Sequence, residues 1–93
     1  MTEWFVYLLE LTDGTLYAGI ATDVARRVTE HDAGKGARYT RGRGPVRLLE
    51  AKGPFDRASA LRVEAWLKRR PKRAKLAALR AVDPSKDLPT RSA

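Results

Sequence analysis

The stretch VYLLELTDGTLYAG, residues 6–19, decides the fold because it holds two short apolar runs joined by a turn signal. WFVYLLEL (4–11) is rich in aromatic and branched residues and is too short for a core helix, so we expect a β-strand there. Thr12-Asp13-Gly14 favours a tight turn, and TLYAGI (15–20) has the pattern of a return strand. These residues therefore predict a β-hairpin at the start of the chain.

Each strand of this hairpin carries one tyrosine, Tyr7 and Tyr17, and the loop length decides whether their rings share a face. A two-residue loop would place them on opposite faces of the sheet. A three-residue loop with Gly14 in the left-handed conformation shifts the register by one, so that Tyr7 opposes Gly19 and Leu9 opposes Tyr17. We predict the three-residue loop, both rings on one face, and open space for a phosphate above Tyr7, opposite Gly19. An ordinary cross-strand aromatic pair is the alternative interpretation.

The remaining sequence predicts one further strand and three helices. The order is β-β-α-β-α-α, typical of a small α+β domain with a mainly antiparallel three-stranded sheet flanked by helices. The domain spans residues 1–82, and the polar residues 83–93 form a flexible C-terminal tail. The expected elements are a helix over 24–33 capped by Thr22 or Asp23 and ending at Gly34, an irregular segment over 34–45, a strand over 46–52 broken by Gly53-Pro54, a helix over 57–70 capped by Asp56 and ended by Pro71, and a helix over 72–82.

Composition excludes several classes of protein. The 93 residues suffice for one domain, and the absence of cysteine excludes disulfides, thiolate metal sites and cysteine nucleophiles. The N-terminus lacks the basic lead and cleavage site of a secretory signal, and no stretch approaches the ~20 apolar residues of a membrane span. We therefore expect a cytoplasmic protein that makes no membrane contact.

Charge gives the first indication of a partner. The formal net charge is +8, which favours a polyanion such as nucleic acid. Basic residues gather in two runs, GKGARYTRGRGPVR (34–47) and KRRPKRAK (68–75). A solvated loop and helix end are one interpretation, and a phosphate-binding surface is the other. For the second, the expected nucleic-acid-binding residues are Lys35, Arg38, Tyr39, Arg41, Arg43, Lys68, Arg69 and Lys72.

Helical periodicity places chemistry-bearing residues along the first helix. Val24 and Val28 mark its expected buried stripe, and Arg27 and the only histidine, His31, lie along one flank. Arg26 and Glu30, four residues apart on the far side, are expected to form a surface ion pair. Arg27 and His31 are either a snorkelling arginine with a satisfied boundary histidine, or members of a site.

The second helix carries a carboxylate inside its apolar arc. Glu64 falls between Leu61 and Leu67, where a charge is costly unless it is paired or bound to a cation. An ion pair with Lys68, one turn later, is the simpler explanation. The alternative is a single carboxylate ligand for a divalent metal that also contacts a phosphate, which is how Mg²⁺ is usually bound.

Together these positions resemble the GIY-YIG nuclease domain, over roughly residues 4 to 80. The two motif tyrosines lie in Val6-Tyr7-Leu8, without the family's initial glycine, and in Tyr17-Ala18-Gly19. The family's helical arginine matches Arg27, the residue one turn later matches His31, and the metal-binding glutamate matches Glu64. Ile20 stands where excision-repair members have lysine, and the asparagine used by some members has no counterpart here. The loop over 34–46 is similar to that of the small stand-alone bacterial members.

The resemblance implies a metal-dependent DNA endonuclease that uses one Mg²⁺ or Mn²⁺ ion and selects DNA structure, branched or single-stranded, rather than sequence. Glu64 would hold the metal and Arg27 would neutralise phosphate charge. Tyr7 would accept a proton from water with help from Arg27, His31 or the metal. His31 would accept or relay that proton, and Tyr17 would share the phosphate or position the water. Targeting through partner proteins, with a role in DNA repair, is a further expectation.

Two other hypotheses remain open at the level of sequence. The first is a non-catalytic nucleic-acid-binding module that keeps the GIY-YIG fold and the basic surface. The second is an unrelated basic α+β domain associated with RNA or the ribosome.

Overall fold

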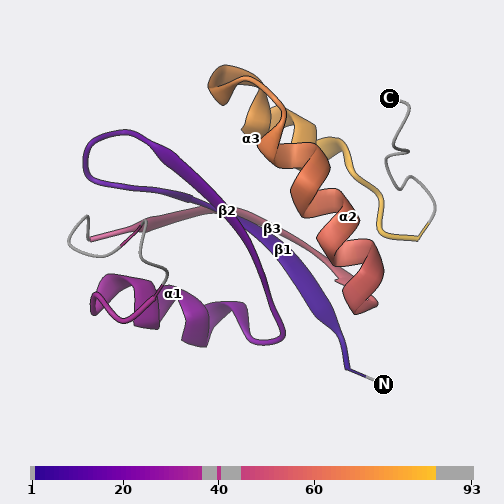
Figure 1. Ribbon diagram of the computed structural model, residues 1–93, viewed down its shortest axis with the longest axis horizontal. Helices are drawn as coiled ribbons and strands as arrows, with labels where there is room; N and C mark the ends of the chain where they lie inside the picture. Colours follow the sequence, from indigo (N-terminus) through magenta and orange to yellow (C-terminus); the bar gives the residue numbers. More distant parts are fainter. Residues whose placement is uncertain (1, 37–39, 41–44, 86–93) are drawn as a thin grey trace.

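The computed structural model describes residues 2–36, 40 and 45–85, which form a sheet between two helical layers (Figure 1). Helix α1 lies on one face of the sheet, and α2 and α3 lie on the other. The three strands are antiparallel in the order β2-β1-β3. The predicted α+β architecture and element order are confirmed. The elements are β1 (Trp4–Glu10), β2 (Leu16–Ala21), α1 (Val24–Asp32), β3 (Arg47–Phe55), α2 (Arg57–Lys68) and α3 (Lys72–Ala81).

The hairpin of β1 and β2 has the predicted three-residue loop. Leu11 N–H donates to the Thr15 carbonyl at 2.9 Å, and Gly14 N–H donates to the Leu11 carbonyl at 2.9 Å, leaving residues 12–14 as the loop. Gly14 has φ 85°, which glycine adopts without a steric penalty. The resulting register pairs Tyr7 with Gly19 and Leu9 with Tyr17, as predicted.

Strand β3 does not break at Gly53-Pro54, as the sequence had suggested, but continues to Phe55. Because β3 is an edge strand, the N–H that proline lacks is not needed for a further ladder. Its register against β1 shifts between Trp4 and Val6, so the proline falls at an irregular place in the pairing. A Cβ at Gly53 would lie 2.8 Å from the Trp4 carbonyl oxygen, which explains the glycine before the proline.

The core has one part on each face of the sheet. The larger part joins Val6 and Leu8 of β1 to α2 and α3, and its buried residues also include Ala18, Phe55, Ala60, Val63, Leu67, Leu79 and Val82. The smaller part lies under α1 and contains Tyr7, Leu9, Leu11 and Ala21, with Tyr17, Val24, Val28, Val46 and Ala51 packed against them. The two motif tyrosines thus belong to the face that α1 covers.

Helix α1 packs on the core with Val24 and Val28, as expected, but its most buried residue is a different one. Val24 and Val28 are only half-buried, and His31 is the fully buried residue of this helix. A histidine can take that position because both of its ring nitrogens have hydrogen-bond partners. Asp23, one of the two predicted caps, accepts a hydrogen bond from Arg26 N–H at 3.0 Å.

Helix α2 begins after its predicted cap, Asp56, whose carboxylate accepts from Ser59 N–H at 2.7 Å. The helix ends at Lys68, two residues before the predicted end, and the Lys75 ammonium of α3 donates to the last carbonyls of α2, Leu67 and Lys68, at 3.0 Å each. Within the described ranges, no helix is long and apolar enough to cross a bilayer. The predicted tail lies outside the described residues from 86 onward.

Candidate active site

Tyr7, Tyr17 and His31 form an aromatic cluster between the hairpin and α1. The ring centroids of the two tyrosines are 6.4 Å apart, and the His31 ring lies 5.9 Å from Tyr7 and 5.3 Å from Tyr17. Tyr7 and Tyr17 therefore share one face of the sheet, as the three-residue loop predicted. The cluster is more than an aromatic pair, because a titratable ring from α1 packs against both phenols.

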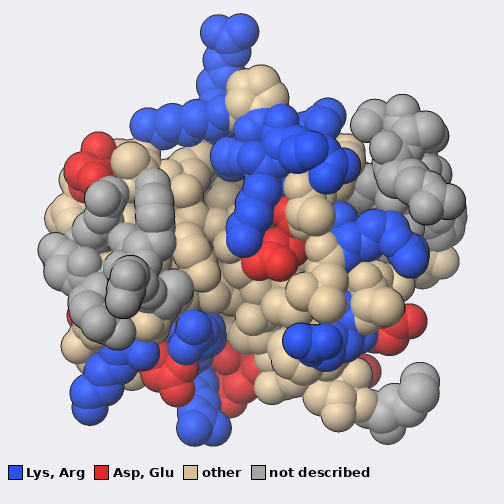
Figure 2. Space-filling view, in the orientation of Figure 1, with Lys and Arg blue, Asp and Glu red and all other residues tan. Residues whose placement is uncertain are grey.

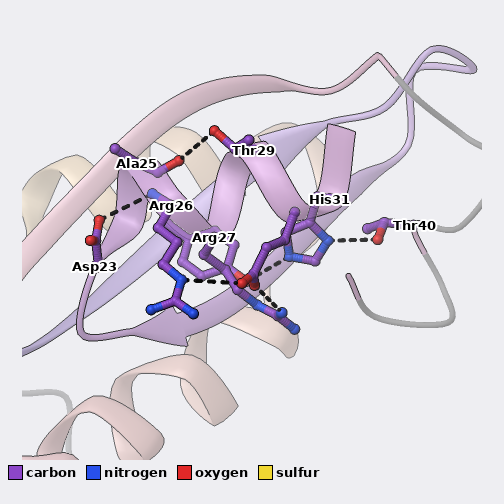
Figure 3. Close-up of polar contacts among 9 residues, drawn as sticks. Asp23, Ala25, Arg26, Arg27, Thr29, His31 and Thr40 are labelled. Carbon is purple, nitrogen blue, oxygen red and sulfur yellow. Dashed lines mark hydrogen bonds and ion pairs between the residues drawn. The ribbon is translucent and has the colours of Figure 1, made fainter. Parts of the chain in front are cut away.

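A chain of buried hydrogen bonds runs from Tyr7 through His31. The Tyr7 hydroxyl lies 2.9 Å from His31 Nε2, and His31 Nδ1 lies 2.6 Å from Thr40 Oγ1. Figure 3 shows the second contact, with the His31 ring reaching from α1 to Thr40. Tyr7 is 1% exposed and the other two residues are fully buried, so water does not compete for these bonds.

Two glycines make room for these rings. A Cβ at Gly19 would contact the Tyr7 hydroxyl and would lie 2.6 Å from Tyr7 Cζ. The prediction of open space opposite Gly19 is therefore wrong, because the Tyr7 ring itself fills that space. A Cβ at Gly36 would likewise contact His31 Nδ1 and lie 2.7 Å from His31 Cε1. Both positions require a residue without a side chain if the rings are to keep their places.

Arg27 borders the cluster on the solvent side. Its guanidinium is within hydrogen-bonding reach of the Tyr7 hydroxyl and donates to Glu30 Oε1 at 2.8 Å. The expected Arg26–Glu30 pair also forms, at 3.4 Å, so Glu30 pairs with two arginines. The Arg27 side chain is 33% exposed and lines a hollow of about 240 Å³ at the end of β2, together with Trp4. An anion in this hollow could reach Arg27.

The buried groups are neutral at pH 7. Burial raises the pKa of Tyr7 to about 12, against the opposing effect of the Arg27 guanidinium. Burial also lowers the pKa of His31, and the positive charge of Arg27 adds to that effect. Tyr7 is therefore a phenol and His31 a neutral imidazole that can accept a proton.

Glu64 lies across the edge strand β2, on the layer of helix α2. Its side chain is 17% exposed and its carboxylate pairs with Lys68 at 3.3 Å, which is the simpler of the two arrangements expected from the sequence. The carboxylate is near enough to raise the pKa of Tyr7 electrostatically. A second hollow, of about 300 Å³, lies on this side of β2 and is lined by Tyr17, Lys68 and Lys75, among others.

A metal at this place would have the Glu64 carboxylate as its one ligand from the protein. Within the described part of the chain, no three histidine, aspartate or glutamate side chains gather as a metal cluster. A single half-buried carboxylate suits Mg²⁺, which keeps several waters and takes further oxygens from a phosphate. The paired ammonium of Lys68 is 54% exposed and can turn to solvent, so the carboxylate is available to a cation.

The predicted nucleic-acid-binding residues fall in two places. Lys68, Arg69 and Lys72 lie exposed around the turn between α2 and α3, where Figure 2 shows lysine and arginine side chains gathered along the top of the molecule. Lys35 is exposed just beyond α1. The other four, Arg38, Tyr39, Arg41 and Arg43, lie outside the described residues.

Sequence reasoning missed Thr40 and Gly36. Both lie in the run 34–47, whose arginines and single tyrosine drew attention to charge instead. Nothing local distinguishes a threonine that bonds a histidine nine residues earlier. For Gly36, the only signal was the excess of glycine in that run.

Comparison with known proteins agrees with this geometry. Residues 3–77 match the GIY-YIG catalytic domain. Relatives named UPF0213 include proteins from Nitratidesulfovibrio vulgaris (52% identity, covering 85% of this chain and 72% of the relative) and Streptococcus agalactiae (49%, covering 77% and 82%). The solution NMR structure of a UPF0213 protein from Bacillus halodurans has 40% identity and a TM-score of 0.52, covering 90% of this chain and 88% of that one. The chain belongs to the GIY-YIG family.

Proposed function

We propose that this protein is a metal-dependent phosphodiesterase that cleaves DNA, selecting DNA structure rather than sequence. The observation that carries the proposal is the position of the Tyr7 hydroxyl. It lies between the cation of Arg27 and the neutral base His31, and it is in electrostatic range of the Glu64 carboxylate. Hydrolysis of a phosphodiester needs a proton acceptor, a cation for the phosphate and help for the leaving oxygen, and these side chains can supply them.

In this proposal, His31 is the terminal proton acceptor and Tyr7 is the relay. Because the pKa of Tyr7 is raised to about 12, the phenol does not hold a negative charge in advance. It can accept a proton from the attacking water only as it passes its own proton to His31 Nε2, 2.9 Å away. The transfer leaves Tyr7 as a neutral phenol and His31 as an imidazolium, and Arg27 stabilises phenolate character on Tyr7 while both protons move.

Arg27 and Tyr17 would bind the phosphate. Arg27 has the N–H donors to pair with phosphate oxygens and is accessible from the hollow at the end of β2. Tyr17, half-buried, borders the second hollow, where it can donate to a phosphate oxygen or hold the water.

The divalent ion, Mg²⁺ or Mn²⁺, would be held by Glu64. When bound, it would neutralise the non-bridging phosphate oxygens and the leaving oxygen. Metal binding would require the Glu64–Lys68 ion pair to break. The Lys68 ammonium could then bind the phosphates of the DNA backbone.

The nucleic acid would follow the basic residues on both sides of the site. With a net charge of +8 and no described element dedicated to reading bases, binding would depend on phosphates and on DNA shape. We expect branched or single-stranded DNA, a place in DNA repair, and partner proteins that direct the enzyme. Since the relatives are bacterial proteins, whose chromosomes lie in the cytoplasm, we propose that location.

A second candidate function is a nucleic-acid-binding module without catalysis. The Glu64–Lys68 ion pair favours it, since the carboxylate has a cationic partner on its own helix. The two functions differ in one property: the binding module would retain DNA affinity and leave every phosphodiester intact.

The experiment incubates purified protein with single-stranded, duplex and branched DNA, with Mg²⁺, with Mn²⁺ or with EDTA. Beside the wild type stand Glu64→Gln and, as the matched control, Glu50→Gln on β3, at the opposite edge of the sheet. We expect metal-dependent cleavage by the wild type and by Glu50→Gln, and loss of cleavage in Glu64→Gln. Binding without cleavage under every metal would support the module, and cleavage that survives Glu64→Gln would overturn the proposed metal site.

A further inference from the structure

The buried hydrogen-bond chain has a direction, and the direction can be worked out from its donors. Arg27 lies beside the Tyr7 hydroxyl and can only donate, which favours the Tyr7 oxygen as an acceptor. Among the described residues, the remaining hydrogen-bonding partner of that hydroxyl is His31 Nε2, at 2.9 Å. A Tyr7 proton that points at Nε2 gives the hydroxyl an acceptor, whose absence would cost about 1–3 kcal/mol in a buried site.

This arrangement also requires an acceptor for the proton of the imidazole. Because Nε2 accepts from Tyr7 and the ring is neutral, the ring proton lies on Nδ1. That proton points at Thr40 Oγ1, 2.6 Å away. A hydroxyl can accept as well as donate, so threonine completes a chain that runs from Arg27 through Tyr7 and His31 to Thr40.

We propose that Thr40 is a positioning residue that holds His31 in its Nδ1–H tautomer and keeps Nε2 free to take the Tyr7 proton. Thr40 is fully buried with its hydroxyl against the His31 ring, and Gly36 lies against the same ring. Without the Thr40 oxygen, the imidazole could turn to the Nε2–H tautomer, whose proton would face the Tyr7 hydroxyl and block the transfer.

The catalytic effect of this tautomer rests on the proposed function, but the tautomer itself can be tested without it. It concerns a tautomer in the folded protein, which exists without DNA, metal or turnover. The chain has one histidine, so a spectrum of the ring nitrogens reports on His31 alone.

The test is long-range ¹H–¹⁵N NMR of the ¹⁵N-labelled full chain at pH 7.5, for the wild type, Thr40→Val and Thr40→Ser. Valine keeps the shape of threonine without the oxygen, and serine keeps the oxygen. We expect a pyrrole-type Nδ1 and a pyridine-type Nε2 in the wild type and in Thr40→Ser. In Thr40→Val we expect the Nε2–H tautomer to become the major form or to exchange with the other.

A wild-type spectrum with the proton on Nε2 would overturn the proposal, and so would a Thr40→Val spectrum identical to the wild type. If Thr40→Val does not fold, the wild-type and Thr40→Ser spectra still decide the tautomer. With cleavage established, kcat should fall about tenfold or more in Thr40→Val with KM unchanged, and Thr40→Ser should restore it. An Nδ1–H tautomer in a protein that cleaves no DNA would refute the proposed function and leave this inference standing.

Discussion

The contact between Gly19 and Tyr7 gives a prediction whose size can be worked from the structure. In Gly19→Ala, the new Cβ would lie 2.6 Å from Tyr7 Cζ and closer still to the hydroxyl, whereas ordinary contacts begin at 3.4 Å. The ring must therefore move by about 1 Å. Tyr7 is 1% exposed and is held between Arg27 and His31, so the movement cannot be taken up by solvent.

Two costs follow from that displacement. Overpacking a dense core costs about 1–3 kcal/mol. A shift of about 1 Å also stretches the 2.9 Å bond to His31 beyond hydrogen-bonding distance, which costs about 1–3 kcal/mol for buried partners. The two costs do not add fully, because a ring that moves away from the new Cβ reduces the overpacking while it breaks the hydrogen bond to His31. We therefore expect a total loss of about 2–4 kcal/mol in the free energy of unfolding.

Urea denaturation followed by circular dichroism measures this loss, and the melting temperature should fall by at least about 10 °C for a chain of this length. The control is the same substitution in a Tyr7→Leu background, since leucine lacks the hydroxyl oxygen and the two ring carbons that approach Gly19 most closely. In that background, Gly19→Ala should cost less than about 1 kcal/mol.

Two results would refute the reasoning. One is a Gly19→Ala protein within about 0.5 kcal/mol of the wild type, which would mean that the ring has room to move. The other is an equal cost in both backgrounds, which would place the strain away from Tyr7.

Three further predictions concern the surroundings of the site. The pKa of His31 is lower in the folded than in the unfolded protein, so the free energy of unfolding should be highest above pH 6.5 and fall below it, by at most about 1.4 kcal/mol per pH unit. In denaturant titrations of a His31→Gln variant, the free energy of unfolding should not change between pH 6.5 and 5. Glu30→Gln should free Arg27 and tighten DNA binding severalfold at low salt in fluorescence anisotropy, and unchanged affinity would exclude Arg27 from the phosphate surface. Lys75→Met should destabilise the protein by about 1–2 kcal/mol through the lost bonds to the end of α2, whereas Arg80→Met, on the exposed side of α3, should not.

Much of the fold could be predicted because local signals agreed with the tertiary structure. Gly14 in the turn fixed the hairpin register, and Asp23 and Asp56 marked the starts of α1 and α2. The predicted end of the third strand at Gly53-Pro54 was wrong, because proline interrupts a central strand but can be accommodated in an edge strand such as β3. The order of strands in the sheet is a long-range property that no local pattern carries.

The candidate site was predicted only as far as spacing could carry it. Helical and strand periods place Tyr7, Tyr17 and His31 on facing surfaces, and the structure brings these rings together. The partner of His31, Thr40, lies nine residues later in the chain, and no local pattern places its hydroxyl at the ring. The elevated pKa of Tyr7 was also beyond the sequence, since it follows from burial that is complete only in the folded core.

Single-turnover cleavage by Tyr7→Phe tests the central claim most directly. Phenylalanine keeps the ring against Gly19 and removes only the hydroxyl that joins Arg27 to His31. If Tyr7 relays the proton from water to His31, the cleavage rate with saturating DNA and Mg²⁺ should fall by about 10²–10⁴-fold while DNA affinity stays the same. Cleavage by Tyr7→Phe at the wild-type rate would contradict the account.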